Sequence, residues 1–546
     1  MTAARESLRE AAAHEIFRIA LEGLADRMQD SLLRAACSVV AREGMDCAAA
    51  LFLPDGRVLA QASSLPLLLG GMIPAVRGIL DRFPAEAMQN GDGYLQNDPW
   101  SGGTHLPDII IARPVRADGR TVALAATILH HQDVGGLAAG SVPPDARDIF
   151  QEGLRIPPVQ WRRAGTEDTG IAAILAANSR APDLLNGDLG AQWAAVSLGA
   201  REVGELVQSM DIPAFEQASD ALIDHARRMT QDALGGLHDG VAIAEDALDG
   251  DGLSDTPVRL RVTLRKSGGT RKPHLEIDFE GSAPQTQGPV NAAPSGLLAA
   301  TFAVLRHLAP DAPANHGMLA PVTLKLPDGS VVNPRFPAAV NARTATVKLA
   351  CNAMLSALSR LGEPEDAVAS NGGVAVVLSA GGQDNAGRNW FFTEIIASGS
   401  GGGPAGPGVA GISTDVSNAR NVPVEMLEIA APIRVETTMR RRGSGGAGLH
   451  QGGDGVRRVY RLLEGSATVS YRGERHHRGA SGAQGGGNGA PSAAFIERHN
   501  GTVEALASKA RFVWNAGDRL IIETAGGGGW RAVSSPTAPS PIPNQE

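Results

Sequence analysis

The sequence predicts an α+β protein: a large mixed fold with β-hairpins and helices in its N-terminal half and a β-rich, glycine-rich C-terminal part. Three observations support this class. Apolar residues recur at helical spacing near the N-terminus, β-prone runs flank Asp-Gly turns, and glycine clusters separate short β-prone segments after residue 371. Because a chain of 546 residues exceeds the usual size of one hydrophobic core, we expect several parts.

The N-terminal half begins with an amphipathic helix over about residues 12–36. Its apolar stripe repeats every three or four residues and consists of Phe17, Leu21, Leu24, Met28 and Leu32. A hairpin follows, because the runs Asp46 to Leu53 and Arg57 to Gln61 flank Pro54-Asp55-Gly56. A second helical pattern opens at Gly70 and runs to about Phe83.

The later elements suggest where the parts divide. Helical patterns cover residues 172–207, with a break at Arg180-Ala181-Pro182, and residues 215–234. After Gly235-Gly236 come strands at 258–264 and 275–279 and helices at 296–308 and 347–361. We therefore expect an N-terminal α+β part (1–235), a mixed α/β middle part (236–370), a β-rich C-terminal part (371–533) and a disordered, proline-rich tail (534–546).

Composition excludes several classes of protein. The net charge is −9, and Arg440-Arg441-Arg442 is the longest basic run, which argues against nucleic-acid binding. No basic region precedes an apolar block, and no apolar run is long enough to cross a bilayer, so we expect a cytoplasmic protein with no membrane partner. The three cysteines have no CxxC spacing, which leaves a zinc ribbon without support.

The segment from Asn97 to Pro158 crowds His, Asp, Gly and Pro residues. Ile109 to Val115 and Val122 to Leu129 are β-prone runs joined by an Asp-Gly turn, so we interpret them as a hairpin. With the turn centred near Asp118, the numbers of paired residues sum to about 236, to within one or two residues. His105 then lies opposite about His131, and Asp108 opposite about Ile128.

This register brings Thr-His-Leu-Pro-Asp and His-His-Gln-Asp together at the open end of the hairpin, which is typical of a metal or acid/base site. Mixed nitrogen and oxygen donors without a thiolate suit Zn, Mn, Fe or Co. Glu152 is an available general base, and its alternative is an ordinary surface carboxylate. The glycine clusters are interpreted as tight turns, and the sequence has no GxxxxGK[ST] phosphate loop.

Motifs along nearly the whole chain resemble the hydantoinase B/oxoprolinase family. The matching stretches are EGMDCAAALFLPDGRVLAQ (43–61), residues 97–158, NGDLGAQ (186–192), GSAPQTQGPVN (281–291), NARNVPVE (418–425), residues 443–453 and residues 526–530. The resemblance implies the metal ligands Asp46, His105, Asp108 and His130. His131 and Asp133 remain alternatives, because a slip of one residue would exchange the facing side chains. With Glu152, they are the candidate catalytic residues.

The resemblance also implies a function. The chain is expected to be the metal-binding hydrolytic subunit of an ATP-dependent cyclic-amide hydrolase, acting on a hydantoin, 5-oxoproline or another lactam. A hydantoinase A-type partner would bind ATP and phosphorylate the amide oxygen, and the two subunits would form a hetero-oligomer.

Two alternatives stay open. The first is a subunit of an ATP-dependent ketone carboxylase, which would use the same pocket. The second is a non-catalytic partner that stabilises the ATP-binding subunit. Many relatives have a histidine in a PxHxG element where this chain has Pro66-Leu67-Leu68-Leu69-Gly70, with Leu68 at the histidine position.

Overall fold

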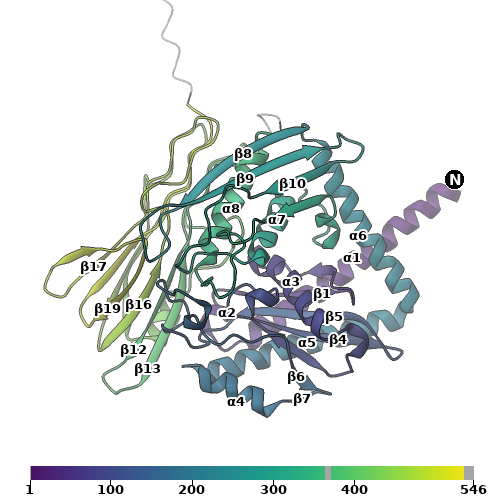
Figure 1. The fold of residues 1–546 in the computed structure, drawn as a ribbon, viewed down its shortest axis with the longest axis horizontal. Helices are drawn as coiled ribbons and strands as arrows, with labels where there is room; N and C mark the ends of the chain where they lie inside the picture. The colour runs from purple at the N-terminus through teal and green to yellow at the C-terminus, as the bar shows by residue number, and fades with distance from the viewer. Residues whose placement is uncertain (1, 363–369, 534–546) are drawn as a thin grey trace, which may run out of the picture.

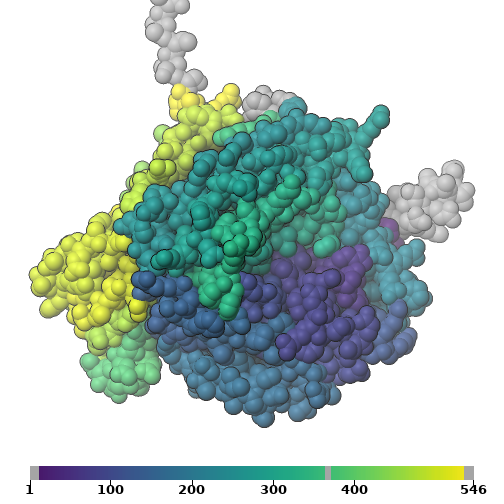
Figure 2. Space-filling model, in the orientation of Figure 1, coloured from purple at the N-terminus to yellow at the C-terminus, as the bar shows by residue number. Residues whose placement is uncertain are grey.

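A computed structural model describes residues 2–362 and 370–533, and the tail expected at 534–546 lies outside them. Within these residues the strands form four sheets, with long helices around the N-terminal and middle sheets (Figure 1). In the space-filling view the C-terminal part, coloured green to yellow, forms one edge of the molecule beside the N-terminal and middle parts (Figure 2). The predicted α+β class is confirmed, and the boundaries near 235 and 370 stay predictions.

The N-terminal sheet is antiparallel and has the order β2-β1-β5-β4-β3-β6-β7. Its strands are β1 (Cys47–Phe52), β2 (Val58–Gln61), β3 (Gly93–Gln96), β4 (Asp108–Ala117), β5 (Arg120–His130), β6 (Val159–Arg163) and β7 (Thr166–Glu167). Successive strand residues alternate between two hydrophobic clusters, so both faces of the sheet are buried. Ile109 and Ile111 face one cluster, and Ile110 and Ala112 face the other.

Helices cover both faces of this sheet. The helices of this half are α1 (Thr2–Ala35), α2 (Val39–Arg42), α3 (Pro66–Arg82), α4 (Thr169–Asn178), α5 (Pro182–Met210) and α6 (Ile212–Gly235). Met28 of α1 and Val196 of α5 pack in the cluster on one face, and Met72 of α3 packs in the cluster on the other. The break expected at Arg180-Ala181-Pro182 is confirmed, because proline begins the new helix at its first position.

The middle part holds a sheet of order β11-β10-β9-β8, in which β10 and β11 are parallel. Its strands are β8 (Gly240–Leu248), β9 (Val258–Ser267), β10 (His274–Asp278) and β11 (Val322–Lys325), and its helices are α7 (Pro294–Leu308) and α8 (Arg343–Leu358). The sequence patterns did not reveal β8. Only Ala242, Ala244 and Leu248 of this strand are fully buried, and they share the cluster with α8.

The C-terminal part is a pair of sheets that share one core. Their orders are β13-β12-β16-β19 and β14-β15-β20-β17-β18. The elements are β12 (Val376–Gln383), β13 (Asn389–Ile396), α9 (Val424–Ala430), β14 (Ile433–Arg440), β15 (Val456–Leu462), β16 (Ser466–Arg472), β17 (Ala493–Glu497), β18 (Val503–Ala505), β19 (Lys509–Asn515) and β20 (Arg519–Glu523). Val469 of the first sheet and Ile522 of the second lie in one cluster, so the expected β-rich part is confirmed.

The glycine clusters correct a prediction. Gly443 and Gly485 have the positive φ of a turn, but the glycines of 526–529 do not, and this segment packs among other glycine-rich segments. Gly527 donates to the Gly453 carbonyl at 2.9 Å and accepts from Gly446 N–H at 2.8 Å. A Cβ on Gly527 would lie 1.8 Å from the Ser400 carbonyl oxygen. Glycine is required here because backbones pack directly against one another.

Replacing Gly527 by alanine is therefore expected to lower the free energy of unfolding by about 3 kcal/mol or more, since the clashing atoms belong to backbone that cannot move aside. Gly190→Ala is the matched control, because Gly190 lies inside α5 with open space around its Cα. The control should stabilise the chain by up to about 1 kcal/mol. Denaturant unfolding of both variants measures this, and equal effects would contradict close backbone packing.

Among the helices of the described residues, none combines the length and apolarity that a bilayer crossing requires. The cytoplasmic location stays a prediction.

Candidate metal site

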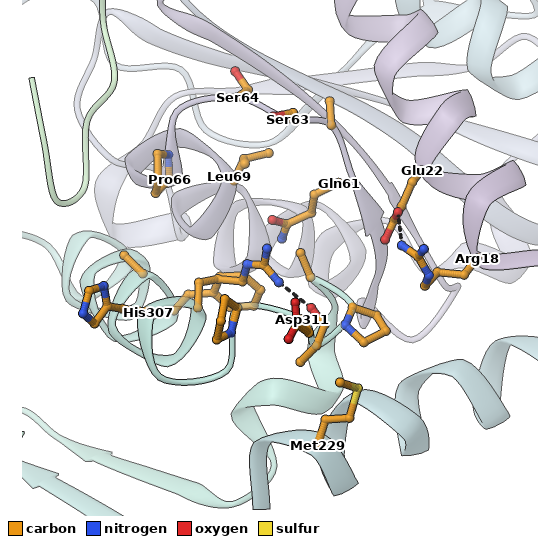
Figure 3. A pocket seen from close by; sticks show the side chains of 18 of the residues that line it. Arg18, Glu22, Gln61, Ser63, Ser64, Pro66, Leu69, Met229, His307 and Asp311 are labelled. Carbon is orange, nitrogen blue, oxygen red and sulfur yellow. Dashed lines mark hydrogen bonds and ion pairs between the residues drawn. The ribbon is translucent and has the colours of Figure 1, made fainter. Parts of the chain in front are cut away.

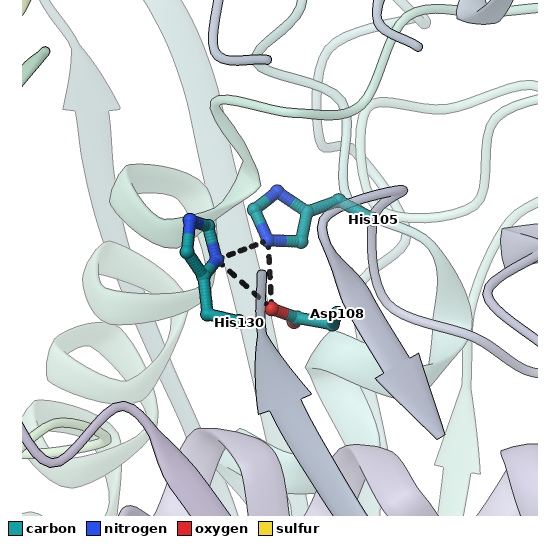
Figure 4. A group of neighbouring side chains, drawn as sticks. All are labelled: His105, Asp108 and His130. Atoms are coloured by element: carbon teal, nitrogen blue, oxygen red, sulfur yellow. Dashed lines mark hydrogen bonds and ion pairs between the residues drawn. The ribbon is translucent and has the colours of Figure 1, made fainter. Parts of the chain in front are cut away.

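Three side chains meet at the open end of the β4–β5 hairpin. Asp108 begins β4, His130 ends β5, and the two residues are paired across the strands. His105 lies in the turn before β4, where its carbonyl accepts from Asp108 N–H at 3.0 Å. Figure 4 shows the two imidazoles and the carboxylate pointing at one another. His105 Nε2 is 2.9 Å from Asp108 Oδ1 and 3.1 Å from His130 Nδ1, and His130 Nδ1 is 3.1 Å from Asp108 Oδ1.

The two carboxylate oxygens of Asp108 face different partners. Oδ2 accepts hydrogen bonds from the Thr104 hydroxyl and the Arg343 guanidinium. Oδ1 faces the two imidazoles. Because Oδ2 is held from two directions, Oδ1 is fixed in its orientation. Against the opposing effect of burial, the Arg343 guanidinium favours the charged form of Asp108 and lowers its pKa.

His105 presents a lone pair to this oxygen. Its Nδ1 lies 3.3 Å from the Asn341 carbonyl oxygen. A carbonyl only accepts, so Nδ1 carries the proton and Nε2 keeps its lone pair. Burial lowers the pKa of His105 to about 3, with a further contribution from Arg343, so the ring is neutral near pH 7. His105 Nε2 and Asp108 Oδ1 thus face each other with lone pairs beside His130 Nδ1, an arrangement that a cation between them stabilises.

The donor spacing fits a transition metal. Metal–ligand bonds to His and Asp are about 2.0–2.2 Å, so two ligands at right angles lie about 3 Å apart. The three donor–donor distances in this cluster, 2.9, 3.1 and 3.1 Å, match that separation. All three side chains are buried, and each offers one ligand atom to the same point.

Asp46 lies beside this group. It directly precedes β1, which pairs with β5, and its backbone carbonyl accepts from His130 N–H at 3.0 Å. Its side chain lines the same cavity as the triad. Burial raises the pKa of Asp46, against the opposing effect of His130. Asp46, which only the family resemblance predicted as a metal ligand, therefore lies in the cavity wall and is not one of the three closely spaced side chains.

The candidates His131 and Asp133 are not among the described residues that line this cavity. His131 Nε2 is 2.9 Å from Gln192 Oε1 of α5. Asp133 is paired with Arg180 at 2.9 Å and accepts from the Gly135 and Gly140 amides, so it holds a loop in place. The register therefore places His130 in the cavity in preference to His131.

Glu152 is fully buried, in contrast to the surface carboxylate that was its alternative. It accepts from the Val340 and Asn341 amides at 2.8 and 2.9 Å and from Asn341 Nδ2 at 3.1 Å. Burial raises its pKa to about 8, although these bonds oppose the shift. Glu152 thus contacts the triad through Asn341, whose carbonyl faces His105.

The cavity around the triad has a volume of about 50 Å³. One wall is apolar and includes Leu65, Leu67, Leu68, Val374, Val377 and Ile395. Three cationic side chains also line the cavity: Arg343, Lys348 and Arg472. No sequence motif singled them out. Leu68 is only 1% exposed, so the departure from PxHxG places an apolar side chain in the cavity wall.

A larger pocket of about 780 Å³ lies among α1, α6, α7 and the segment after β2 (Figure 3). Its charged groups include Arg18, which is paired with Glu15 and Glu22 of the same helix. Pro66 and Leu69 line this pocket, whereas Leu67 and Leu68 line the metal cavity. The triad lies in the smaller cavity, and the two cavities share the first turn of α3 as a wall.

Replacing Arg343 tests whether a bound metal ion lies beside Asp108. In metal-free protein, Arg343→Met should lower the free energy of unfolding by about 3–5 kcal/mol, because it leaves a buried carboxylate without its partner. A bound divalent cation would compensate that charge, so loading with metal should reduce the loss. Denaturant unfolding with chelator and with added metal measures both values.

The matched control is Arg458→Met, because Arg458 forms a buried pair with Glu394 away from the triad. Its loss of stability should be the same with and without metal. An equal metal effect in the two variants would contradict a cation beside Asp108.

The family described as hydantoinase B/oxoprolinase matches this chain over residues 10–532. The chain belongs to this family. A relative from Pseudomonas sp. (strain NS671), named as a putative D-/L-hydantoinase subunit, is 31% identical over 473 residues, which are 84% of this chain and 79% of the relative. The resemblance stated from the sequence motifs is thereby confirmed.

Two solved structures share the fold of this hydantoinase B/oxoprolinase family member. An ATP-dependent caprolactamase from Pseudomonas jessenii has a TM-score of 0.87 at 25% identity, covering 96% of this chain and 91% of that chain. A nucleotide-free acetone carboxylase has a TM-score of 0.88 at 18% identity, covering 96% of this chain and 76% of that chain. The second likeness extends to the fold alone.

Proposed function

We propose that this chain is the metal-binding hydrolytic subunit of an ATP-dependent cyclic-amide hydrolase. The observation that carries the proposal is the buried group of His105, Asp108 and His130, whose possible ligand atoms lie close enough together to hold one metal ion. Membership of the hydantoinase B/oxoprolinase family and the likeness to the caprolactamase support the reaction class.

The triad would hold a divalent Zn, Mn, Fe or Co ion, with Asp46 beside it as the fourth candidate ligand. Such an ion, when bound, polarises a carbonyl group or lowers the pKa of water.

The chain's own residues prepare the site. Thr104 and Arg343 orient Asp108, and Asn341 fixes the tautomer of His105. Glu152 holds Asn341 by accepting from its backbone amide and its side-chain amide, and it also accepts from the Val340 amide, so we assign it a positioning role. The apolar wall that contains Leu68 limits the amount of water near the triad.

A partner protein would activate the amide for attack. An amide is a poor electrophile, and the sequence has no phosphate loop, so we propose that a hydantoinase A-type partner binds ATP and phosphorylates the amide oxygen. The Pseudomonas relative is named as one subunit of a hydantoinase, which is in keeping with a hetero-oligomer. The present chain would then open the activated ring of a hydantoin, 5-oxoproline or another lactam.

The reaction class is tested on the purified complex with ATP. It is incubated separately with a hydantoin, 5-oxoproline, caprolactam, or a ketone with bicarbonate, and the products are identified by mass spectrometry. We expect a ring-opened product from at least one cyclic amide. Carboxylation of the ketone without opening of any cyclic amide would replace the proposal by the carboxylase alternative.

A further inference from the structure

Three cationic side chains line the cavity beside the triad. These are Arg343, Lys348 and Arg472, against the carboxylates of Asp46 and Asp108. Asp415 lies 3.9 Å from Lys348, so the carboxylates equal the cations in number, and a divalent cation on the triad would create an excess of positive charge. Because a buried excess of one sign is unfavourable, the cavity favours a ligand of the opposite sign.

Two of the three cationic groups already have hydrogen-bond partners. Arg343 donates to Asp108 Oδ2, and Arg472 donates to the Asn341 carbonyl at 2.7 Å and to Asn341 Oδ1 at 2.8 Å. Both guanidinium groups therefore support residues of the site. Lys348 differs from them.

The Lys348 side chain is 2% exposed, and its Nζ has no hydrogen-bond partner among the described residues. The Asp415 carboxylate is 3.9 Å away, too far for a hydrogen bond. An ammonium group has three donors, and in the part of the chain that the structure describes none of them has an acceptor, although Asp415 lies within ion-pair distance. Burial lowers the pKa of Lys348, so an anionic ligand beside it would favour the charged form.

The location of Lys348 favours contact with a substrate. Arg343, Thr344 and Lys348 of α8 all line the cavity. Ser413 and Ser417 line it from the other side, and Asp415 between them lines the larger pocket. Lys348 therefore lies next to the wall that separates the triad from the larger, open pocket.

We propose that Lys348 binds an oxyanion of the substrate: either a carboxylate carried by the ring or the phosphoryl group placed on it. The inference rests on the proposed function and narrows the substrate class to cyclic amides that are anionic when they reach the triad. Lys348 is then a substrate-binding residue, and its ammonium group complements the charge of the ligand.

The first test uses the isolated, metal-loaded chain, with inorganic phosphate and 5-oxoproline as separate probes in titration calorimetry. Lys348→Met should weaken binding of at least one probe tenfold or more, and Lys348→Arg should restore part of it. Lys266→Met is the matched control, because Lys266 is equally buried but bonds to Asp239 at 2.7 Å, away from the cavity. Equal affinities of the wild type and Lys348→Met, or binding of neither probe by the wild type, would overturn the proposal.

The second test uses the complex with its ATP-binding partner and distinguishes the two sources of the oxyanion. A rise in KM confined to 5-oxoproline, with uncharged caprolactam unaffected, would assign Lys348 to a ring carboxylate. A loss of kcat on both substrates would assign it to the phosphoryl group. Unchanged kcat and KM on both would overturn the proposal. A complex that opens no cyclic amide contradicts the proposed function, whereas the titrations still decide the role of Lys348.

Discussion

Replacing His105 by alanine, or Asp108 by alanine, is expected to remove the divalent metal from the purified chain. Each residue supplies one of three converging donor atoms. Loss of outer groups that only orient ligands commonly costs 10- to 100-fold in metal affinity, so loss of a ligand should cost about 100-fold or more. Elemental analysis after dialysis should therefore find about one metal per wild-type chain and less than about 0.1 per variant chain.

His131→Ala is the matched control for this measurement. His131 follows His130 directly and is equally buried, but its ring bonds to Gln192 on the other side. This variant should lose stability and keep its metal. Stoichiometric metal in His105→Ala and Asp108→Ala would contradict the site, and metal lost from His131→Ala but kept by His130→Ala would show that the wrong histidine was assigned.

The second large effect concerns His130 in the assembled enzyme. His130→Ala should stop ring opening by the complex, because it removes a donor atom from the triad while leaving the outer surface unchanged. The side chain is only 6% exposed, so the variant should still assemble with the ATP-binding partner. Product formation and size-exclusion chromatography measure the two properties. An active variant complex would contradict a role of the triad in the reaction.

Part of this site was accessible from local sequence patterns. The Asp-Gly turn and the two β-prone runs predicted the hairpin, and the hairpin placed the histidine and aspartate motifs together. The register lies at the limit of the range of one or two residues given for it, since Asp108 pairs with His130 and the central estimate was Ile128. The loop is centred between Asp118 and Gly119, and an irregularity between Val115 and Arg116 adds one further residue.

Other features depend on long-range packing. Arg343, Asn341 and Lys348 reach the site from α8 and the segment before it, more than 200 residues after Asp108, and no local pattern marks them. The structural role of the glycine clusters was hard to predict for a related reason. Glycine is favoured both in turns and where backbones pack closely, so composition could not distinguish the segment around Gly527 from a set of turns.

The division of labour between two subunits is tested most directly by measuring ring opening and phosphate release with each subunit alone and with the mixture. We expect that the isolated, metal-loaded chain neither hydrolyses ATP nor opens a hydantoin, 5-oxoproline or caprolactam ring, and that the mixture opens a ring only when ATP is present. Ring opening by the isolated chain without nucleotide would contradict this account and indicate a self-sufficient metal-dependent amidohydrolase.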